Sequence, residues 1–378
     1  MTDVSFLRSR QIRVVFNALH AKSGGGVTYL RNLLPALAKD PAFELHLFVH
    51  ETQFADFADL HECIRLHVFS FPTSFLRLLL WEQLLLPLLV HDVSADLVVS
   101  PANYGPLLLR RQVIVLQNSL AVGACETRWS KKIYWQALSL MTAASLLSAK
   151  AAVAVSDYVA KTAIGLPHSV RKRISVIHHG VGDLFHPGPT PRENFLLAVG
   201  DLYVQKNFET LIHAIHIVAR KTPDICLKIV GRSLDLDYSQ RLYALVKELG
   251  LEKNVEFHGH CPPQMVADLY RRCQVFVFPS IEESFGMPVL EAMNSGCSIA
   301  CSNSAAMPEV AGDTVRYFSP TSATEMAIAI ETLNNDPALR AEYTEKALKR
   351  AALFRWENSA LSFGQLLKRL HSKDRARR

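Results

Sequence analysis

Short runs of β-branched and other apolar residues alternate along the chain with longer stretches in which apolar residues recur at spacings of three and four. The short runs predict buried strands, and the longer stretches predict amphipathic helices. Alternation of this kind is typical of βαβ units, in which helices cover both faces of a parallel sheet. The predicted strands are residues 12–18, 43–50, 64–71, 95–101, 111–118 and 151–157 in the first half, and 194–201, 225–232, 254–260, 274–280 and 298–303 in the second.

The length of the chain and a cluster of turn residues predict two domains. At 378 residues the chain exceeds what one hydrophobic core usually serves. The strongest linker signal between the two series of strands consists of Gly180, Gly182, Pro187 and Gly188. We therefore expect the α/β class, with two doubly wound Rossmann-like domains that face each other across a cleft. Their predicted bounds are 1–182 and 183–357, followed by a C-terminal helix and basic tail over 358–378.

One segment, residues 75–90, is strongly apolar and reads FLRLLLWEQLLLPLLV. It is 16 residues long and is interrupted by Arg77, Glu82, Gln83 and Pro87. A helix needs about 20 apolar residues to span a bilayer, so this segment is short for that purpose. We interpret it as a buried core helix closed by Pro87, with an interfacial helix on a membrane surface as the alternative.

The formal net charge of +6 is concentrated at the end of the chain. Residues 368–378 contain six Lys or Arg and one acid, Asp374, which leaves the rest of the chain nearly neutral. A nearly neutral body argues against a nucleic-acid partner. The basic tail is either a solvated, frayed end or a segment attracted to an anionic membrane surface.

Cysteine usage and the N-terminal segment indicate a cytoplasmic protein. The seven cysteines are scattered and contain no C-x-x-C pair, which favours reduced thiols over disulfides or zinc ligands. The segment MTDVSFLRSRQIRVVF contains no apolar run before a small-residue cleavage site, so it predicts no secretory signal. We expect a cytoplasmic location, extended by peripheral contact with the cytoplasmic face of the membrane.

Two glutamates, Glu283 and Glu291, flank the connector SFGMP after a predicted buried strand. Open α/β sheets bind ligands at the carboxyl ends of their strands, where this connector lies. Pro288 suits the first turn of the next helix, and the N–H groups of residues 285–287 approach the helix start, which favours anionic or hydroxyl-rich ligands. Two carboxylates there can accept hydrogen bonds from the diols of sugars and ribose. Without a ligand, Glu291 would only complement the helix dipole and Glu283 would be solvated.

Two further motifs suit a phosphate or a closely bound ligand. Lys206 and Asn207 stand at a predicted helix start, where an ammonium group and free N–H groups meet a phosphate. The glycines of SGGGVTYLRNLL, residues 23–34, let a ligand approach the backbone, but they lack the G-x-G-x-x-G spacing of a dinucleotide site. The alternatives are an ordinary surface lysine and a turn without a ligand.

Several motifs of the C-terminal half occur in a familiar order: AVGDLYVQKNF, then NVEFHGHCPPQMVADLYRRCQVFVFPSIEESFGMPVLEAMNSGCSIACSNSAAMPEVAGD, then FRWENSA. Through them, residues 194–358 resemble the retaining, nucleotide-sugar-dependent glycosyltransferases of family 4, the group 1 family with the GT-B fold. The N-terminal half is more loosely similar, through GGGVTYLRNLLPAL, LLLWEQLLLP, DLVVSPANYG and VAVSDYVAKTA.

The resemblance implies a role for each candidate residue. Glu291 would bind the nucleotide ribose, Glu283 the donor sugar and Lys206 the diphosphate, and Glu283 and Lys206 are the candidates for catalysis. Gly25 and Gly26 match the glycine loop that closes over the donor. The remaining donor-binding candidates are Asn207, Ser284, Phe285, Gly286 and Met287. The resemblance implies no metal ion and no other cofactor.

Two positions depart from the family pattern. Many members carry a basic residue where this chain has Asp201, so the diphosphate would depend on Lys206, on helix N–H groups and on Arg232 as a substitute. Many also carry a histidine where this chain has Gln117 or Asn118. An amide can contact an acceptor or sugar hydroxyl, but it cannot act as a base.

Together these features predict a retaining glycosyltransferase in surface polysaccharide biosynthesis. It would move a hexose, with mannose as first choice, from GDP-mannose or a UDP-sugar to a glycan or lipid-linked oligosaccharide. A noncatalytic nucleotide-sugar or glycan-binding subunit of the same fold is the alternative, and the glycine spacing counts against a Rossmann oxidoreductase. His178 and His179 are expected to pack between the domains, because no D-x-D or H-x3-H pattern accompanies them.

Overall fold

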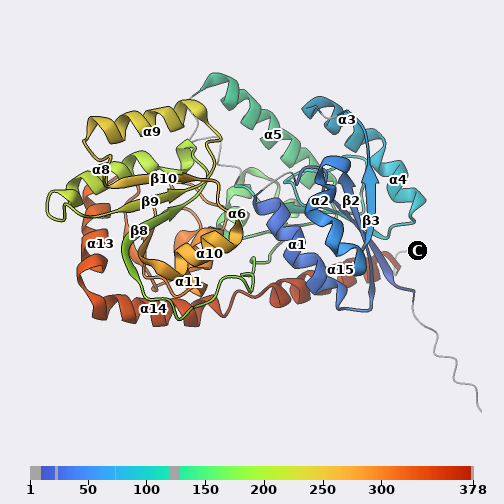
Figure 1. Cartoon of the computed structure of the whole chain (residues 1–378). Helices are drawn as coiled ribbons and strands as arrows, with labels where there is room; N and C mark the ends of the chain where they lie inside the picture. Colours follow the sequence, from blue (N-terminus) through green and yellow to red (C-terminus); the bar gives the residue numbers. More distant parts are fainter. Residues whose placement is uncertain (1–9, 22–23, 73, 120–127, 376–378) are drawn as a thin grey trace, which may run out of the picture.

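The computed structural model describes residues 10–21, 24–72, 74–119 and 128–375, which form two lobes, each built on a parallel sheet (Figure 1). Within these residues the N-terminal sheet has the strand order β3 (Arg65–Phe69), β2 (Phe43–His50), β1 (Ile12–Asn17), β4 (Leu97–Ser100), β5 (Gln112–Leu116), β6 (Ala151–Ala154) and β7 (Ile174–Val176). The C-terminal sheet has the order β10 (Val255–Gly259), β9 (Leu227–Val230), β8 (Glu193–Val199), β11 (Cys273–Phe278), β12 (Ile299–Ser302) and β13 (Arg316–Phe318). Each order reverses once, between β1 and β4 and between β8 and β11, which confirms the two doubly wound sheets.

Helices cover both faces of each sheet, because strands of this kind are apolar on both sides. In the N-terminal lobe, α1 (Gly25–Ala38) and α15 (Trp356–Arg375) pack on one face, and α3 (Phe75–Leu84) and α4 (Leu86–Asp92) on the other. The smaller or peripheral helices there are α2 (Phe54–Phe57), α5 (Trp129–Ser148), α6 (Asp157–Thr162) and α7 (His168–Arg171). In the C-terminal lobe, one face carries α8 (Phe208–Ala219), α9 (Leu236–Glu248) and α13 (Ala323–Asn335); the other carries α10 (Pro263–Arg272), α11 (Met287–Asn294), α12 (Met307–Ala311) and α14 (Pro337–Ala351).

Each strand that the sequence predicted is present, mostly as a shorter element. The strands β7 and β13 were not predicted, because three residues of mixed burial are too few to show a period. Helix α5 was also not predicted. Its first half is largely exposed and carries apolar residues on the solvent side, which blurs the helical pattern.

The apolar segment 75–90 forms two helices, so the prediction of one core helix closed by Pro87 is wrong. The first helix ends at Leu84, and Pro87 lies in the first turn of the second, where its missing N–H is tolerated. Leu78 and Leu86 are buried, but Leu84 and Leu88 are 63% and 62% exposed. No helix in the described part of the chain combines the length and apolarity needed to cross a bilayer.

The chain crosses between the lobes twice, and the two crossings lie side by side. Val181 N donates to Phe354 O at 3.1 Å, and Val181 forms an isolated parallel bridge with Arg355. A Cβ on Gly180 would lie 2.1 Å from the backbone nitrogen of Trp356, so only glycine permits this approach. The predicted boundaries after residues 182 and 357 stay a prediction.

Helix α15 carries the second crossing back onto the N-terminal lobe (red in Figure 1), where it packs against α1. Phe363 and Leu367 of this helix are fully buried. Lys368 pairs with Asp40 at 2.6 Å, and Lys150 donates to Leu370 O at 2.6 Å. The interpretation of residues 368–375 as a frayed end is therefore wrong, since this part of the basic segment is a docked helix.

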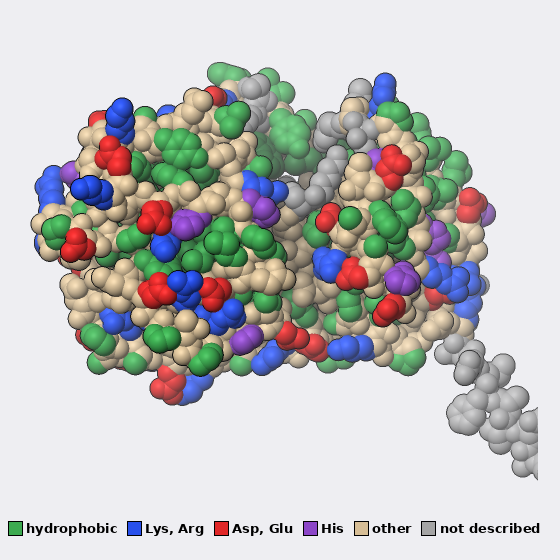
Figure 2. Space-filling view, viewed as in Figure 1, with side chains coloured by type: hydrophobic (Ala, Val, Ile, Leu, Met, Phe, Trp, Pro, Cys, Tyr) green, Lys and Arg blue, Asp and Glu red, His purple; other side chains and the backbone are tan. Residues whose placement is uncertain are grey.

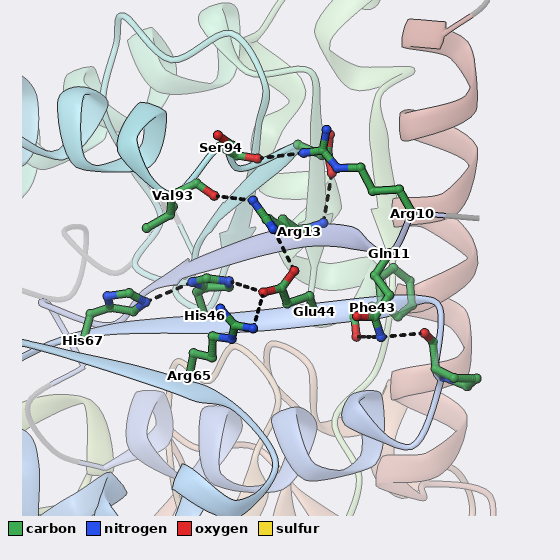
Figure 3. Close-up of polar contacts among 12 residues, drawn as sticks. Arg10, Gln11, Arg13, Phe43, Glu44, His46, Arg65, His67, Val93 and Ser94 are labelled. Carbon is green, nitrogen blue, oxygen red and sulfur yellow. Dashed lines mark hydrogen bonds and ion pairs between the residues drawn. The ribbon is translucent and has the colours of Figure 1, made fainter. Parts of the chain in front are cut away.

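A polar cluster ties the outer strands of the N-terminal sheet at their amino-terminal ends (Figure 3). Glu44 accepts a hydrogen bond from Arg13 Nε at 2.7 Å and forms an ion pair with Arg65 Nη2 at 3.0 Å. His46 Nδ1 lies 2.9 Å from His67 Nε2. This end of the sheet lies opposite the carboxyl edge where ligands bind. The described residues contain no group of three or more His, Cys, Asp or Glu side chains placed to hold a metal ion.

His179 packs in the apolar junction between the lobes, in agreement with the expectation from sequence. Its ring lies 5.3 Å from that of Tyr29, 4.9 Å from Phe285 and 5.5 Å from Trp356. Burial, together with the neighbouring His178, lowers the pKa of His179 to about 3. The folded protein therefore holds this imidazole neutral across the range in which an unfolded histidine, with a pKa of about 6.5, takes up a proton.

This junction should make the fold sensitive to acid. Between about pH 6.5 and pH 3, His179 takes up a proton in the unfolded state but not in the folded state. The free energy of unfolding therefore falls by up to about 1.4 kcal/mol for each pH unit by which the pH is lowered. We expect His179→Phe to lose less melting temperature than the wild type between pH 7 and about pH 5. Thermal melts of both proteins, with the exposed-site variant His213→Gln as control, measure this. Equal losses in wild type and His179→Phe would contradict the assignment.

Candidate functional site

The candidate residues of the C-terminal lobe gather where the strand order reverses. Strand β8 leads to the turn η5 (Val204–Lys206), and β11 leads to the connector 279–286 before α11. Because β8 and β11 are parallel neighbours, both loops leave the sheet at its carboxyl edge. Ile281 N donates to Gln205 O at 2.9 Å and joins the two loops directly.

An ion pair between Lys206 and Glu283 holds these loops together. Lys206 Nζ contacts Glu283 Oε1, and their side chains are only 9% and 16% exposed. Ser280 Oγ donates to the same oxygen at 3.1 Å. Burial alone would lower the pKa of Lys206, but the charges of Glu283 and Tyr203 oppose it, and the pKa is raised. Lys206 therefore remains a cation throughout the physiological range.

Glu291 lies one turn into α11 and comes within electrostatic reach of Lys206. Tyr270 Oη donates to Glu291 Oε2 at 3.3 Å. Burial raises the pKa of Glu291 to about 8, although Tyr270 and Lys206 act in the opposite direction. A ligand that donates hydroxyl hydrogens to this carboxyl would stabilise the ionised form. The structure thus brings Lys206 and both predicted glutamates into one site.

The start of α11 presents unpaired backbone donors to this site. In the described structure, the N–H groups of residues 284–287 have no hydrogen-bond acceptor. Gly286 makes the turn possible, with φ of 86°, and a Cβ there would lie 2.2 Å from Met307 Cε. The ring of Phe285 points into the junction with His179, so the backbone of Phe285 is the part available to a ligand. Unpaired N–H groups at a helix start favour an anion or a hydroxyl-rich ligand.

Asp201, the departure from the family pattern, is paired with Arg232. Arg232 Nη2 contacts Asp201 Oδ2 at 2.7 Å, and Arg232 N donates to Asp201 Oδ1 at 2.9 Å. Burial would raise the pKa of Asp201, but the hydrogen bonds and charge of Arg232 lower it below its ordinary value. The loop after β9 therefore places a guanidinium near η5, where the sequence analysis named it as a substitute cation.

The side chain of Asn207 is used to hold the fold. Its amide donates to Pro279 O at 3.0 Å and to Pro320 O at 2.7 Å. Its Oδ1 accepts from Thr210 Oγ1 at 2.7 Å, and its φ of 58° is the left-handed turn between η5 and α8. The backbone N of Asn207 also donates to Val204 O at 3.1 Å, so Asn207 positions Lys206 against the connector and is itself engaged within the fold.

The predicted residues of the N-terminal lobe meet at the carboxyl edge of its own sheet. A Cβ on Gly26 would lie 3.8 Å from Gln117 Oε1, so the glycine loop faces the end of β5, while Gly25 borders open space. Asn103 Oδ1 accepts from the backbone N of Gln117 at 2.7 Å and of Asn118 at 3.0 Å. Gln117 Nε2 is buried and has no partner among the described residues. This amide is an unused donor beside the glycine loop.

The connector also contacts the N-terminal lobe, and Figure 2 shows a hollow between the two lobes. Ser119 N donates to Ser284 Oγ at 2.9 Å, and Ser156 Oγ donates to Ser284 O at 2.6 Å. Ser119 follows Gln117 and Asn118 in the same loop. The candidate residues of the two lobes therefore share one interdomain region.

The sequence analysis did not predict the polar contacts that hold the two lobes together in this region. Glu309 accepts from the backbone N of Asp157 at 2.7 Å and of Tyr158 at 3.0 Å, and His178 Nε2 lies 2.7 Å from the same carboxylate. Tyr158 Oη donates to Glu282 at 2.7 Å. The partners are more than 120 residues apart, so no local pattern reveals them. The one local signal for these contacts was Glu282, a second acidic residue directly before Glu283.

Two family models match the chain in succession. The model described as Glycosyltransferase Family 4 matches residues 23–183, and the model described as Glycosyl transferases group 1 matches residues 184–350. The chain belongs to the family 4 glycosyltransferases. The family and the GT-B fold expected from the sequence are both confirmed.

Curated relatives and solved structures agree with this assignment. The O-antigen chain mannosyltransferase RfbU of Salmonella typhimurium LT2 is 28% identical over 270 residues, which cover 70% of this chain and 73% of RfbU. The serotype-specific mannosyltransferase WbdA of Escherichia coli is 28% identical over 58% of this chain, which spans only 27% of WbdA. Anabaena HepE, solved with UDP and glucose, has a TM-score of 0.76 at 20% identity and covers 95% of this chain and 100% of its own. At that identity HepE supports the fold alone.

Because the pKa of Glu291 is raised, we predict that removing its charge stabilises the fold, and that this stabilisation grows with pH. Between about pH 4.3, where an unfolded glutamate ionises, and pH 8, the folded state keeps a proton that the unfolded state loses. Stability therefore falls as pH rises through this window. We expect Glu291→Gln to match the wild type near pH 5 and to melt at least about 2 °C higher at pH 8. Melting curves at both pH values test this, with exposed Glu252→Gln as control, and a difference that does not grow with pH would contradict it.

Proposed function

We propose that this protein is a retaining glycosyltransferase that transfers a hexose from a nucleotide-diphosphate sugar to a glycan or lipid-linked oligosaccharide in surface polysaccharide biosynthesis. The observation that carries the proposal is the row of N–H groups over residues 284–287, which find no acceptor among the described residues, beside Lys206, Glu283 and Glu291. The cation and the N–H donors suit a diphosphate. The two carboxyls suit the hydroxyls of ribose and sugar.

The same groups account for the chemistry. Cleavage of the bond between sugar and phosphate places negative charge on the leaving diphosphate, and Lys206 and the start of α11 would stabilise it. Arg232 would add positive charge from its place on Asp201. Glu283 already shares its charge with Lys206 and Ser280, so it suits hydrogen bonding to the sugar better than attack on the anomeric carbon. Fixed cations thus replace any need for a resident metal ion.

Mannose is our first choice of sugar, and GDP-mannose and UDP-sugars are the donors to test first. RfbU and WbdA carry mannosyltransferase in their names, and RfbU is named for the O-antigen chain. HepE was solved with UDP and glucose, which supports a nucleotide-sugar donor in this fold. The relatives also support a surface glycan as the acceptor.

A noncatalytic subunit that binds a nucleotide-sugar or glycan is the second candidate. It is favoured by Gln117, whose amide cannot take up a proton from an acceptor. Incubation with a radiolabelled nucleotide sugar and a lipid extract of the producing cells separates the two. Label in the lipid fraction supports the transferase, whereas donor binding without turnover supports the subunit.

The two glutamates should fail in different ways. Glu291→Ala removes hydrogen bonds to ribose, so we expect nucleoside diphosphate binding to weaken about 10- to 100-fold. Glu283→Ala leaves the ribose contacts, so we expect binding within a few-fold of wild type and turnover reduced about 100-fold. Thermal shift with GDP and UDP and a transfer assay measure both, with Glu252→Ala as control. If neither variant changes binding or transfer, the site is misplaced.

We also propose that the protein is cytoplasmic and touches the membrane surface through its N-terminal lobe. Large apolar side chains are exposed along α3, α4 and α5, and Figure 2 shows such side chains on the upper side of the molecule. Trp129 is 80% exposed, and Ile133, Leu84 and Leu88 are each more than half exposed. The exposed Lys132 stands among them. Aromatic, aliphatic and basic side chains together suit an anionic bilayer surface, where a lipid-linked acceptor would lie.

Vesicle sedimentation tests this surface. We expect the wild type to sediment with anionic phosphatidylglycerol vesicles, and less in high salt. Replacing Leu84, Leu88, Trp129 and Ile133 by Gln should weaken binding at least about tenfold, because the buried apolar area is lost. The control replaces Leu353 and Leu361, which are 67% and 62% exposed elsewhere, by Gln. A wild type that stays in the supernatant would remove the proposal.

A further inference from the structure

A buried polar cluster lies at the carboxyl edge of the N-terminal sheet and is not explained by donor binding. Glu82 of α3 is fully buried. Its Oε1 accepts from Asn17 Nδ2 at 2.5 Å, and its Oε2 lies 3.0 Å from His20 Nε2. The other ring nitrogen, His20 Nδ1, lies 3.0 Å from Tyr104 Oη. Four side chains from three distant segments therefore form one hydrogen-bonded chain.

The carboxylate of Glu82 determines which atom donates and which accepts in each hydrogen bond of this cluster. A carboxylate shielded from water is stable only when its oxygens accept hydrogen bonds or face a cation. Nε2 of His20 must therefore carry the proton, which leaves Nδ1 as the nitrogen with a free lone pair. Tyr104 O–H donates to that lone pair. The order hydroxyl, imidazole, carboxylate is the arrangement that activates a hydroxyl group in nucleophilic enzymes.

The position of the cluster connects it to the interdomain site. His20 follows β1 and Tyr104 follows β4, and these neighbouring strands flank the point where the strand order reverses. Asn103, next to Tyr104, binds the backbone of Gln117 and Asn118. Ser119, one residue further, binds the donor connector. The phenol thus lies at the ligand-binding edge of the lobe that faces the donor.

Tyr104 is mostly buried, with only 5% of its surface exposed. Burial, followed by the charges of Glu82 and Tyr134, raises the pKa of Tyr104. The resting phenol therefore keeps its proton and is a hydrogen-bond donor to His20. Tyr134 belongs to α5 and is 46% exposed, and it lies near enough to Tyr104 to influence the pKa of the phenol.

We propose that Tyr104, His20 and Glu82 form the proton relay for the glycosyl acceptor, in place of the base that Gln117 cannot supply. This inference rests on the proposed transferase function.

In the reaction, the acceptor oxygen forms a bond to the anomeric carbon while the bond from that carbon to the diphosphate oxygen breaks. The electron pair of the broken bond leaves with the diphosphate. The acceptor proton passes to Tyr104 Oη as the phenolic proton passes to His20 Nδ1, and Glu82 stabilises the resulting imidazolium. The proton then leaves His20 for solvent or the departing diphosphate. Tyr104 contacts the acceptor, and His20 and Glu82 are positioning residues that act through it.

The experiment compares Tyr104→Phe and Glu82→Gln with the wild type. Both changes keep the shape of the side chain and remove the phenolic oxygen or the charge. Gln83→Ala is the matched control, because Gln83 ties the same helix to the backbone of Gly105 and Leu107 without touching the relay. The assay follows transfer of label to a lipid extract at several concentrations of the nucleotide sugar, which gives kcat and KM, and GDP and UDP binding and melting temperature are measured in parallel.

We expect both relay variants to lower transfer at least about 100-fold while nucleotide binding stays within about twofold. The loss should appear in kcat, with the KM for the nucleotide sugar within about twofold of wild type, because the relay acts on the acceptor and not on the donor. The double variant should be no slower than the slower single variant, since the residues act as a unit.

Three results would overturn the relay. Transfer within about threefold of wild type in Tyr104→Phe would show that the cluster is only structural, and Tyr104→Phe decides this even if Glu82→Gln does not fold. Independent, multiplying effects of the two changes would also reject it. A loss of melting temperature with kcat unchanged, as expected for Gln83→Ala, would do the same. A wild type that neither binds nor turns over nucleotide sugars would instead contradict the proposed function itself.

Discussion

In a parallel sheet every strand ends at the same edge, and the site of this protein depends on that constraint. Each lobe projects its loops from one edge, and the two edges meet at a shared region. The C-terminal lobe contributes Lys206 and the connector with Glu283, and the N-terminal lobe contributes the glycine loop and the segment around Gln117. Residues that are far apart in sequence are thus placed together without any loop long enough to need its own fold.

Apolar packing holds these polar groups in place. One continuous core includes α1 and α15 on the N-terminal lobe and α10, α11 and α12 on the other. Phe285 lies inside it and packs against His179, so the ring of Phe285 anchors the turn whose N–H groups lack acceptors among the described residues. Preorganised donors of this kind need no rearrangement when charge develops on a ligand, which is the principal electrostatic advantage of an enzyme site.

The sequence predicted much of the fold because its signals were local. Buried strands with β-branched runs, and the connector between Glu283 and Glu291, can be recognised from neighbouring residues alone. The break between α3 and α4 was missed because apolar composition does not show which leucines face solvent, and Leu84 and Leu88 do. Glu82 was treated as an interruption of an apolar helix, since its partners Asn17 and His20 lie more than 60 residues away. Contacts between lobes, such as Glu309 with His178, depend on tertiary closure and leave no pattern in the sequence.

Helix α15 also determines the order in which the protein can be completed during synthesis. The face of the first sheet that α1 only partly covers receives Phe363 and Leu367 from α15, which leaves the ribosome after both sheets. The lobe that is translated first therefore remains incomplete until α15 is made, while the helices of the second lobe are made before α15. Until α15 docks, apolar surface of the nascent N-terminal lobe is uncovered, and this lobe is the part of the molecule that would require a chaperone.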